Sequence, residues 1–232
     1  MLKKAIYGLI FLSPMILYFF WFGIHLDGKL SDNNGDWGGF GSFISGVWGP
    51  TLSFVTILIL IHTNSEQRKK DLLKRFEDRF YGMINYQRDF YNKNEIYFEG
   101  EKRSYYQLIK IFEEILFAEK NIARINTEVV SDVVYPLVRH FYLLLKSIDR
   151  EYAAGNISKS DRDLYYEYLM NLTDFDLTRL IFFYLFTNQE NSNRNSKYIL
   201  QSKDFMKIVS ELGLKEYIDD IENVMLNIKN IN

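Results

Sequence analysis

Two long apolar runs near the N-terminus contain no charged residue. The first runs from Ala5 to Ile24 and the second from about Phe40 to Ile61. In a helix with a rise of about 1.5 Å per residue, about 20 residues cross a hydrocarbon layer of about 30 Å. A cleaved signal peptide is the alternative for the first run, but that run is longer than a typical signal core and no small-residue cleavage site follows it. We therefore predict a hairpin of two transmembrane helices over residues 1–62, with spans at about 5–24 and 40–61.

Charged residues flank the two runs unevenly. Lys3 and Lys4 precede the first run, and the link 25–39 carries three aspartates against one lysine. A basic segment follows the second run and consists of Arg68, Lys69, Lys70, Lys74 and Arg75. Because basic residues favour the cytoplasmic side of a membrane, this distribution places both termini in the cytoplasm. The basic segment can also bind anionic lipid headgroups, although the topology signal alone would account for it.

The glycine-rich stretch DWGGFGSFISGVWGP, residues 36–50, leads into the second span. Small side chains recur there at helical spacing and form what we name the small-residue stripe: Ser42, Gly46, Gly49, Ser53 and Thr56. Residues three and four apart share one face of a helix, and small residues let two helices approach closely in lipid. A phosphate-binding loop is disfavoured because the stretch has no lysine and no preceding strand.

Two interpretations of the small-residue stripe remain open at this point. The stripe either packs the hairpin against itself, or packs several copies together and lines a passage when they assemble. Neither span contains a charged residue, which disfavours a permanent ion pathway with a charged filter. A pore of small residues that opens on a trigger remains compatible with the sequence, and Pro50 is a candidate hinge within it.

The remaining residues 63–232 have apolar positions at helical spacing and little strand-like alternation. We expect an all-α cytoplasmic domain. The predicted helices cover about 104–120, 130–152, 161–171, a segment from Asp174, 202–211 and 214–229, with a break at Gly155–Asn156 and a polar loop at 188–196. Ser131, Asp132, Ser158, Ser160 and Asp174 are candidate helix caps.

A seam at heptad spacing precedes these helices. It consists of Leu73, Phe76, Phe80, Met83, Gln87 and Phe90. The seam is typical of an amphipathic core helix, and the alternative is a short stalk between copies of the chain.

The charge and the composition of the chain exclude several kinds of site. The chain has 28 basic and 30 acidic residues, three histidines and no cysteine. The charge balance argues against strong direct binding of a nucleic-acid duplex, and the absence of cysteine excludes disulfides and thiolate sites. No histidine has a partner at metal-ligand spacing. We therefore expect no metal, no cofactor and no enzymatic activity.

Two polar motifs suggest sites but have simpler explanations. Arg139 and His140 are reminiscent of an α-helical ribonuclease signature, but the residues before them do not fit it, and His140 is expected at the edge of the core. Tyr105 and Tyr106, with basic residues nearby, are expected either to stack on a base or to fill the core.

Two blocks of the sequence resemble a known family. WGGFGSFISGVWGPTLSFVTILILIHTNSEQ, followed by RFEDRFYGMI, resembles the start of the phage abortive infection proteins of bacteria. YPLVRHFYLLLKSID and then YYEYLMNLTDFDLTRLIFFYLFTNQ resemble the second block of that family. The resemblance implies a multi-pass protein of the bacterial inner membrane with two spans and an α-helical cytoplasmic tail.

The resemblance also implies a function in antiviral defence. Such an effector stays silent until infection, then damages or permeabilises the inner membrane. Proteins of this type also occur beside retron reverse transcriptases, so the expected partners are the lipid bilayer, further copies of the chain, and a reverse transcriptase with its DNA–RNA product that holds the effector inactive. The family supplies no catalytic residues. The alternatives are a membrane-anchored sensor or scaffold that recruits partners through its tail, and, less favoured, a channel gated by a nucleotide.

Overall fold

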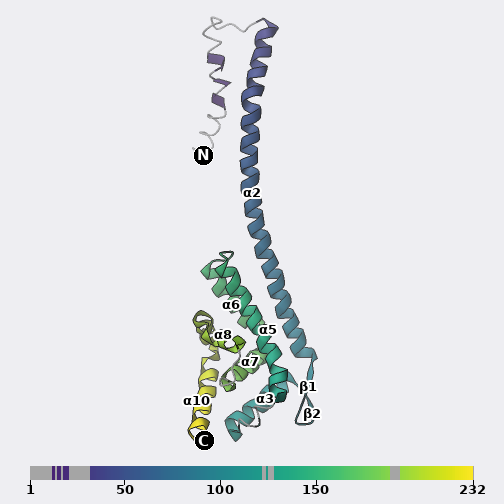
Figure 1. Ribbon diagram of the computed structural model, residues 1–232, viewed down its shortest axis with the longest axis vertical. Helices are drawn as coiled ribbons and strands as arrows, with labels where there is room; N and C mark the ends of the chain where they lie inside the picture. Colours follow the sequence, from purple (N-terminus) through teal and green to yellow (C-terminus); the bar gives the residue numbers. More distant parts are fainter. Residues whose placement is uncertain are drawn as a thin grey trace. The chain divides into compact units, whose positions relative to one another are not determined.

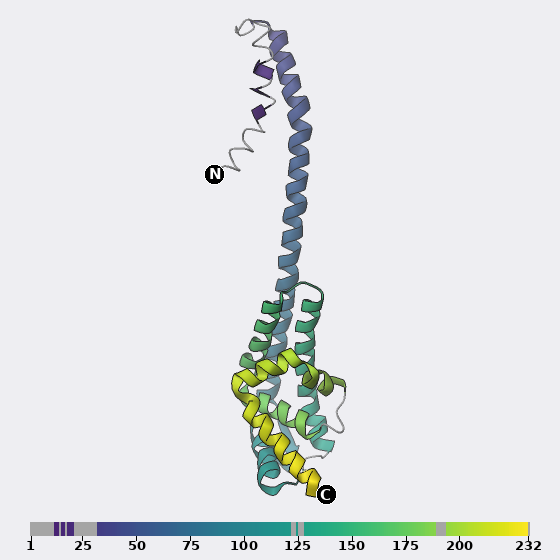
Figure 2. The ribbon, with the colours of Figure 1, turned by 90° about the vertical axis from the view of Figure 1, so that its left-hand side faces the viewer.

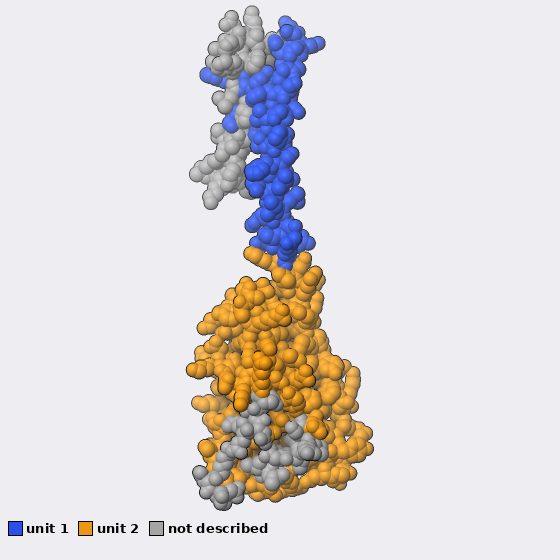
Figure 3. Space-filling view, viewed as in Figure 1, with its two compact units in different colours: residues 1–68 blue, residues 69–232 orange. Residues whose placement is uncertain are grey.

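The computed structural model describes residues 12–13, 15–16, 18–20, 32–121, 124, 128–188 and 194–231. These residues are mostly helical, as an all-α protein requires. The chain divides into two compact units, residues 1–68 and 69–232, which Figure 3 distinguishes by colour.

The first unit is dominated by the N-terminal half of α2 (Asn34–Lys93), the long helix in Figure 1. At the start of this helix the side-chain oxygen of Asn33 accepts a hydrogen bond from the amide of Gly35 at 2.9 Å. Asp36 lies in the first turn, where the helix dipole favours a carboxylate. The helix therefore begins a few residues before the predicted second span, and it is long and apolar enough to cross a membrane.

The first predicted span lies largely outside the described residues. Those residues of it that the structure describes, 12–13, 15–16 and 18–20, are helical. The ring of Tyr18 lies 4.6 Å from that of Phe40 and 5.2 Å from that of Phe43, measured between centroids. The contact between these segments is thus aromatic, and the two-helix hairpin itself remains a prediction.

The second unit is a bundle around a central apolar helix, α7, as Figures 1 and 2 show. Besides the second half of α2, it contains α3 (Tyr105–Glu114), α5 (Glu128–Ala153), α6 (Lys159–Leu172), α7 (Phe175–Thr187), α8 (Arg194–Gln201), α9 (Lys203–Val209) and α10 (Lys215–Ile231), with π-helical turns at Ile115–Glu119 and Ser210–Leu214. Every residue from Leu177 to Thr187 is buried except Arg179. A helix that is apolar on all sides belongs in a core, and α3, α5 and α10 pack against it.

Several predicted helix boundaries are confirmed by their caps. Ser158 and Asp161 form a reciprocal capping box at the start of α6. The Asp174 carboxylate accepts hydrogen bonds from the first turn of α7. The predicted caps Ser131 and Asp132 are wrong, because α5 already begins at Glu128 and both residues lie inside it, as does Pro136.

Two elements were not expected. An antiparallel hairpin pairs β1 (Glu95–Phe98) with β2 (Glu101–Ser104) and is turned by Glu99 and Gly100, which have φ values of 50° and 83°. Consecutive residues with positive φ are typical of the tightest hairpin turns. In addition, α8 occupies the end of the predicted polar loop at 188–196, of which residues 189–193 lie outside the described part.

The heptad seam of α2 is buried within its own chain. Phe76 and Phe80 are 2% and 1% exposed, and both rings meet the ring of Tyr165 in α6 edge-on. Leu73, Met83 and Phe90 pack against the same core. The core-helix interpretation is therefore confirmed. The stalk alternative is wrong, because helices of the same chain already cover this face.

Candidate functional site

The small-residue stripe lies in the first half of α2 and is exposed along its whole length. Ser42, Gly46, Gly49, Ser53 and Thr56 are all exposed. A Cβ atom added at Gly46 or Gly49 would meet no described atom within 4 Å. The half-buried positions nearby are Phe40, Ile44 and Trp48, on another side of the helix. Within the described residues, the aromatic side of α2 makes the local contacts, and nothing supports packing of the stripe within its own chain.

The hydroxyl groups along this part of α2 donate to the helix itself. Ser53 donates to the carbonyl of Gly49 at 2.9 Å, and Thr56 donates to the carbonyl of Leu52 at 2.7 Å. Such bonds satisfy a hydroxyl donor without water, so these residues are compatible with lipid or with a second helix. Pro50 lies inside the helix, which continues through it, so the predicted hinge is not seen as a break. It still has no amide hydrogen to donate to the carbonyl four residues earlier.

The basic segment continues along α2, and all five of its side chains are exposed. Arg68 belongs to the first unit, and Lys69, Lys70, Lys74 and Arg75 belong to the second. Arg75 also borders an open groove of about 640 Å³ in the second unit, together with Arg79 and Arg150. Glu151 lines the same groove and lies 3.6 Å from Arg79. This groove therefore has mixed charge, and the exposed basic side chains of α2 remain the candidates for headgroup contact.

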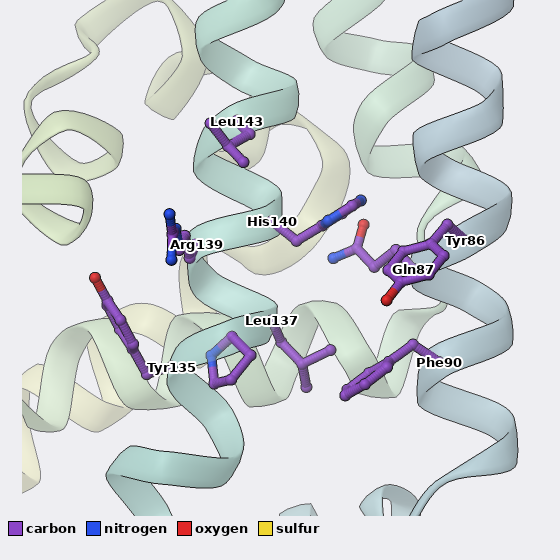
Figure 4. A pocket seen from close by; sticks show the side chains of 9 residues that line it. Tyr86, Gln87, Phe90, Tyr135, Leu137, Arg139, His140 and Leu143 are labelled. Carbon is purple, nitrogen blue, oxygen red and sulfur yellow. The ribbon is translucent and has the colours of Figure 1, made fainter.

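Arg139 and His140 do not form a joint catalytic pair. His140 is half-buried, and its Nε2 lies 2.9 Å from the carbonyl oxygen of Met83, so the imidazole joins α5 to α2. Arg139 is exposed, and Figure 4 shows it on the other side of α5 from the His140 ring. The expectation that His140 sits at the edge of the core is confirmed.

Tyr105 and Tyr106 also point to different environments. Tyr105 is 3% exposed, and burial raises the pKa of its phenol to about 12. Tyr106 is 46% exposed, and the ammonium group of Lys110 lies 4.1 Å from its ring centroid. The two rings do not make a shared stacking surface, so Tyr105 serves the core.

A hollow of about 290 Å³ lies in the second unit, between α5 and the second half of α2 (Figure 4). Its walls are Tyr86, Gln87 and Phe90 from α2, and Tyr135, Pro136, Leu137, Arg139, His140 and Leu143 from α5. Gln87 is 2% exposed, and neither its Nε2 nor its Oε1 has a hydrogen-bond partner among the described residues. The heptad spacing in the sequence correctly predicted that Gln87 lies in the core. A polar residue within an otherwise apolar seam was the one feature of the sequence that could have indicated this hollow.

The candidate functional residues therefore lie in three separate places: the small-residue stripe, the basic segment and the hollow. Among the residues that the structure describes, no group of three or more metal-binding side chains occurs. The chain matches no protein-family model, no curated protein and no solved structure, so its function has to be argued from these residues.

Proposed function

We propose that this chain is an antiphage defence effector that damages or permeabilises the bacterial inner membrane when infection triggers it. The observation that carries the proposal is the exposed small-residue stripe on the apolar segment 40–61 of α2, which contains no charged residue. The resemblance to phage abortive infection proteins supplies the biological setting. In this proposal the chain spans the membrane twice, both termini are cytoplasmic, and a partner such as a retron reverse transcriptase with its DNA–RNA product holds it inactive.

The stripe supports the proposal through the physics of helix association in lipid. Lipid tails cover leucine as well as another helix does, so large apolar side chains give no preference for a helical partner. Glycine and serine do give such a preference, because they let two backbones approach closely. An uncovered stripe of small residues is therefore suited to a second copy of the same helix.

A toxic membrane segment also needs two arrangements, one silent and one active. A helix whose stripe faces lipid and a helix whose stripe faces other copies are two such states. A partner that binds only the silent state would hold the population there, and its release would allow assembly. The exposed basic segment supports the expected orientation, since basic residues favour the cytoplasmic side.

The test replaces Gly46 and Gly49 together with leucine. Both side chains would enter open space, so the helix should still form and insert. Gly41→Leu is the matched control, because Gly41 is exposed on the same helix but lies off the stripe. Each variant is expressed in bacteria alone and with its genomic neighbours, and the membrane potential is followed with a voltage-sensitive dye.

We expect the double variant to insert and to lose depolarisation and growth arrest, while Gly41→Leu keeps both. Unchanged depolarisation in the double variant would contradict the proposed role of the stripe. Replacement of residues 1–62 by an unrelated membrane hairpin is the second test. Defence that survives this exchange would favour the anchored sensor or scaffold, which acts through its helical tail.

A further inference from the structure

The open groove that Arg75 borders is lined by three arginines from two helices. Its volume is about 640 Å³, and its arginines are Arg75 and Arg79 of α2 and Arg150 in the last turn of α5, all within the second unit. We propose that this groove binds a phosphate monoester, the group that a phosphorylated small molecule or the headgroup of phosphatidic acid presents. The proposal is independent of membrane damage, since binding can be measured whether or not the chain depolarises cells.

One of the three arginines is held in place by the wall of the groove. The guanidinium of Arg79 lies 3.6 Å from the carboxylate of Glu151, and its Nε donates to the main-chain carbonyl of Arg75 at 3.2 Å. Glu151 also accepts a hydrogen bond from Asn156 at 2.7 Å, and its side chain is only 14% exposed. The side chain of Arg79 is 68% exposed, and a guanidinium has five N–H donors. Glu151 therefore orients Arg79 and leaves donors for a ligand.

The other two arginines supply positive charge that the described part of the chain does not pair. Arg75 and Arg150 are exposed, and neither guanidinium has an ion pair or a hydrogen bond among the described residues. Arg75 and Arg79 are four residues apart on α2, a spacing at which like charges repel. A phosphate monoester carries a charge of about −1.5 to −2 at pH 7, which matches two unpaired guanidiniums. Each guanidinium can bind phosphate through two parallel hydrogen bonds.

Asp78 is the lining residue that opposes an anion. Three arginines against Asp78 and Glu151 leave the groove with a net charge of +1. Because like charges repel, the carboxylate of Asp78 lowers the affinity of the groove for phosphate. Its replacement by asparagine should therefore strengthen binding, a change that damage to the fold would not produce.

The groove has room for more than a phosphate group. Its volume of about 640 Å³ lies within the range of roughly 300–1,000 Å³ that is usual for small-molecule sites. Leu72 and Ala154 add apolar surface to its walls, so the organic part of the ligand can lie beside the phosphate. A phosphodiester carries only one negative charge and matches the two unpaired guanidiniums less well than a monoester does.

The test is isothermal titration calorimetry of the full-length protein in nanodiscs of phosphatidylcholine. The probes are inorganic phosphate and glycerol phosphate, with the diester glycerophosphocholine as the singly charged comparison. Further nanodiscs contain either phosphatidic acid, a monoester lipid, or phosphatidylglycerol, an anionic diester lipid. Arg75→Gln, Arg150→Gln and Asp78→Asn change the groove. The matched controls are Lys74→Gln and Arg139→Gln, exposed on the same two helices but outside the groove.

We expect glycerol phosphate to bind in phosphatidylcholine nanodiscs, and to bind about fivefold more weakly in each groove arginine variant. Binding should be tighter in Asp78→Asn and unchanged in both controls. Weaker apparent binding with phosphatidic acid than with phosphatidylglycerol would show that the lipid headgroup occupies the groove, and equal binding would assign the groove to soluble phosphorylated molecules.

Three results would overturn the proposal. The first is no binding of glycerol phosphate by the wild-type protein. The second is equal binding of glycerol phosphate and glycerophosphocholine, since two guanidiniums should prefer the doubly charged group. The third is an equal loss of affinity in Lys74→Gln and in the groove variants, because the attraction would then come from the general charge of α2.

Discussion

Replacement of Gln87 by methionine should make the protein more stable. Gln87 is 2% exposed in the apolar seam of α2, and both of its amide atoms lack a partner within the described residues. A buried polar group without a partner costs about 1–3 kcal/mol. Methionine has the same unbranched shape without the amide. We therefore expect Gln87→Met to raise the free energy of unfolding by about 1–3 kcal/mol, against a total of about 5–15 kcal/mol for a typical domain.

The assay is urea unfolding of the full-length protein at a fixed detergent concentration, followed by far-ultraviolet circular dichroism. The matched control is Gln67→Met on the exposed surface of the same helix, which should change stability by no more than about 0.5 kcal/mol. A loss of more than about 1 kcal/mol in Gln87→Met would refute the reasoning, because it would mean that the amide has partners in the folded protein.

Three further changes test the second unit. Phe80→Ala should lower the free energy of unfolding by about 3–5 kcal/mol, because the ring is 1% exposed in the core; Leu72→Ala, at an exposed position, is the control in the same urea assay. Asp174→Ala removes the cap of α7 and should cost about 1 kcal/mol, measured in the same way. Burial and a hydrogen bond to Asp149 raise the pKa of Tyr166 above its unfolded value of 10.0. The stability from this neutral phenol is therefore complete below pH 10.0 and lost as the pH rises above it, which thermal unfolding from neutral to alkaline pH can detect; a flat profile would contradict the assignment.

The helices of the second unit could be predicted because their signals are local. A capping residue such as Ser158 or Asp174 fixes where a helix begins, and the apolar period that follows fixes which face is buried. The hairpin at 95–104 gave no comparable signal, since each strand has only four residues and its turn depends on a positive φ at Glu99. A short strand is stabilised by its partner, which a local pattern does not reveal.

The two candidate sites also differ in how far the sequence alone could predict them. The small-residue stripe depends on one helix, so residue spacing was enough to find it. The hollow depends on two helices that are distant in sequence, and the spacing of Gln87 gave no indication that His140 lies opposite it. Spacing also could not show that His140 bonds the carbonyl of Met83, which excludes its use in a pair with Arg139.

The exposed apolar surface of α2 and its small-residue stripe make different demands on the surroundings. Phe54, Ile57 and Leu60 are 62%, 53% and 61% exposed, and apolar surface of this extent is rarely left in contact with water. Lipid tails can cover these large side chains completely, so this part of the surface is suited to a membrane and to nothing more specific. Gly46 and Gly49 carry no side-chain carbon, so they leave a shallow groove along the helix. The backbone of a neighbouring helix fills such a groove at least as well as lipid does. The apolar side chains thus argue for location in the membrane, and the glycines argue for association within it.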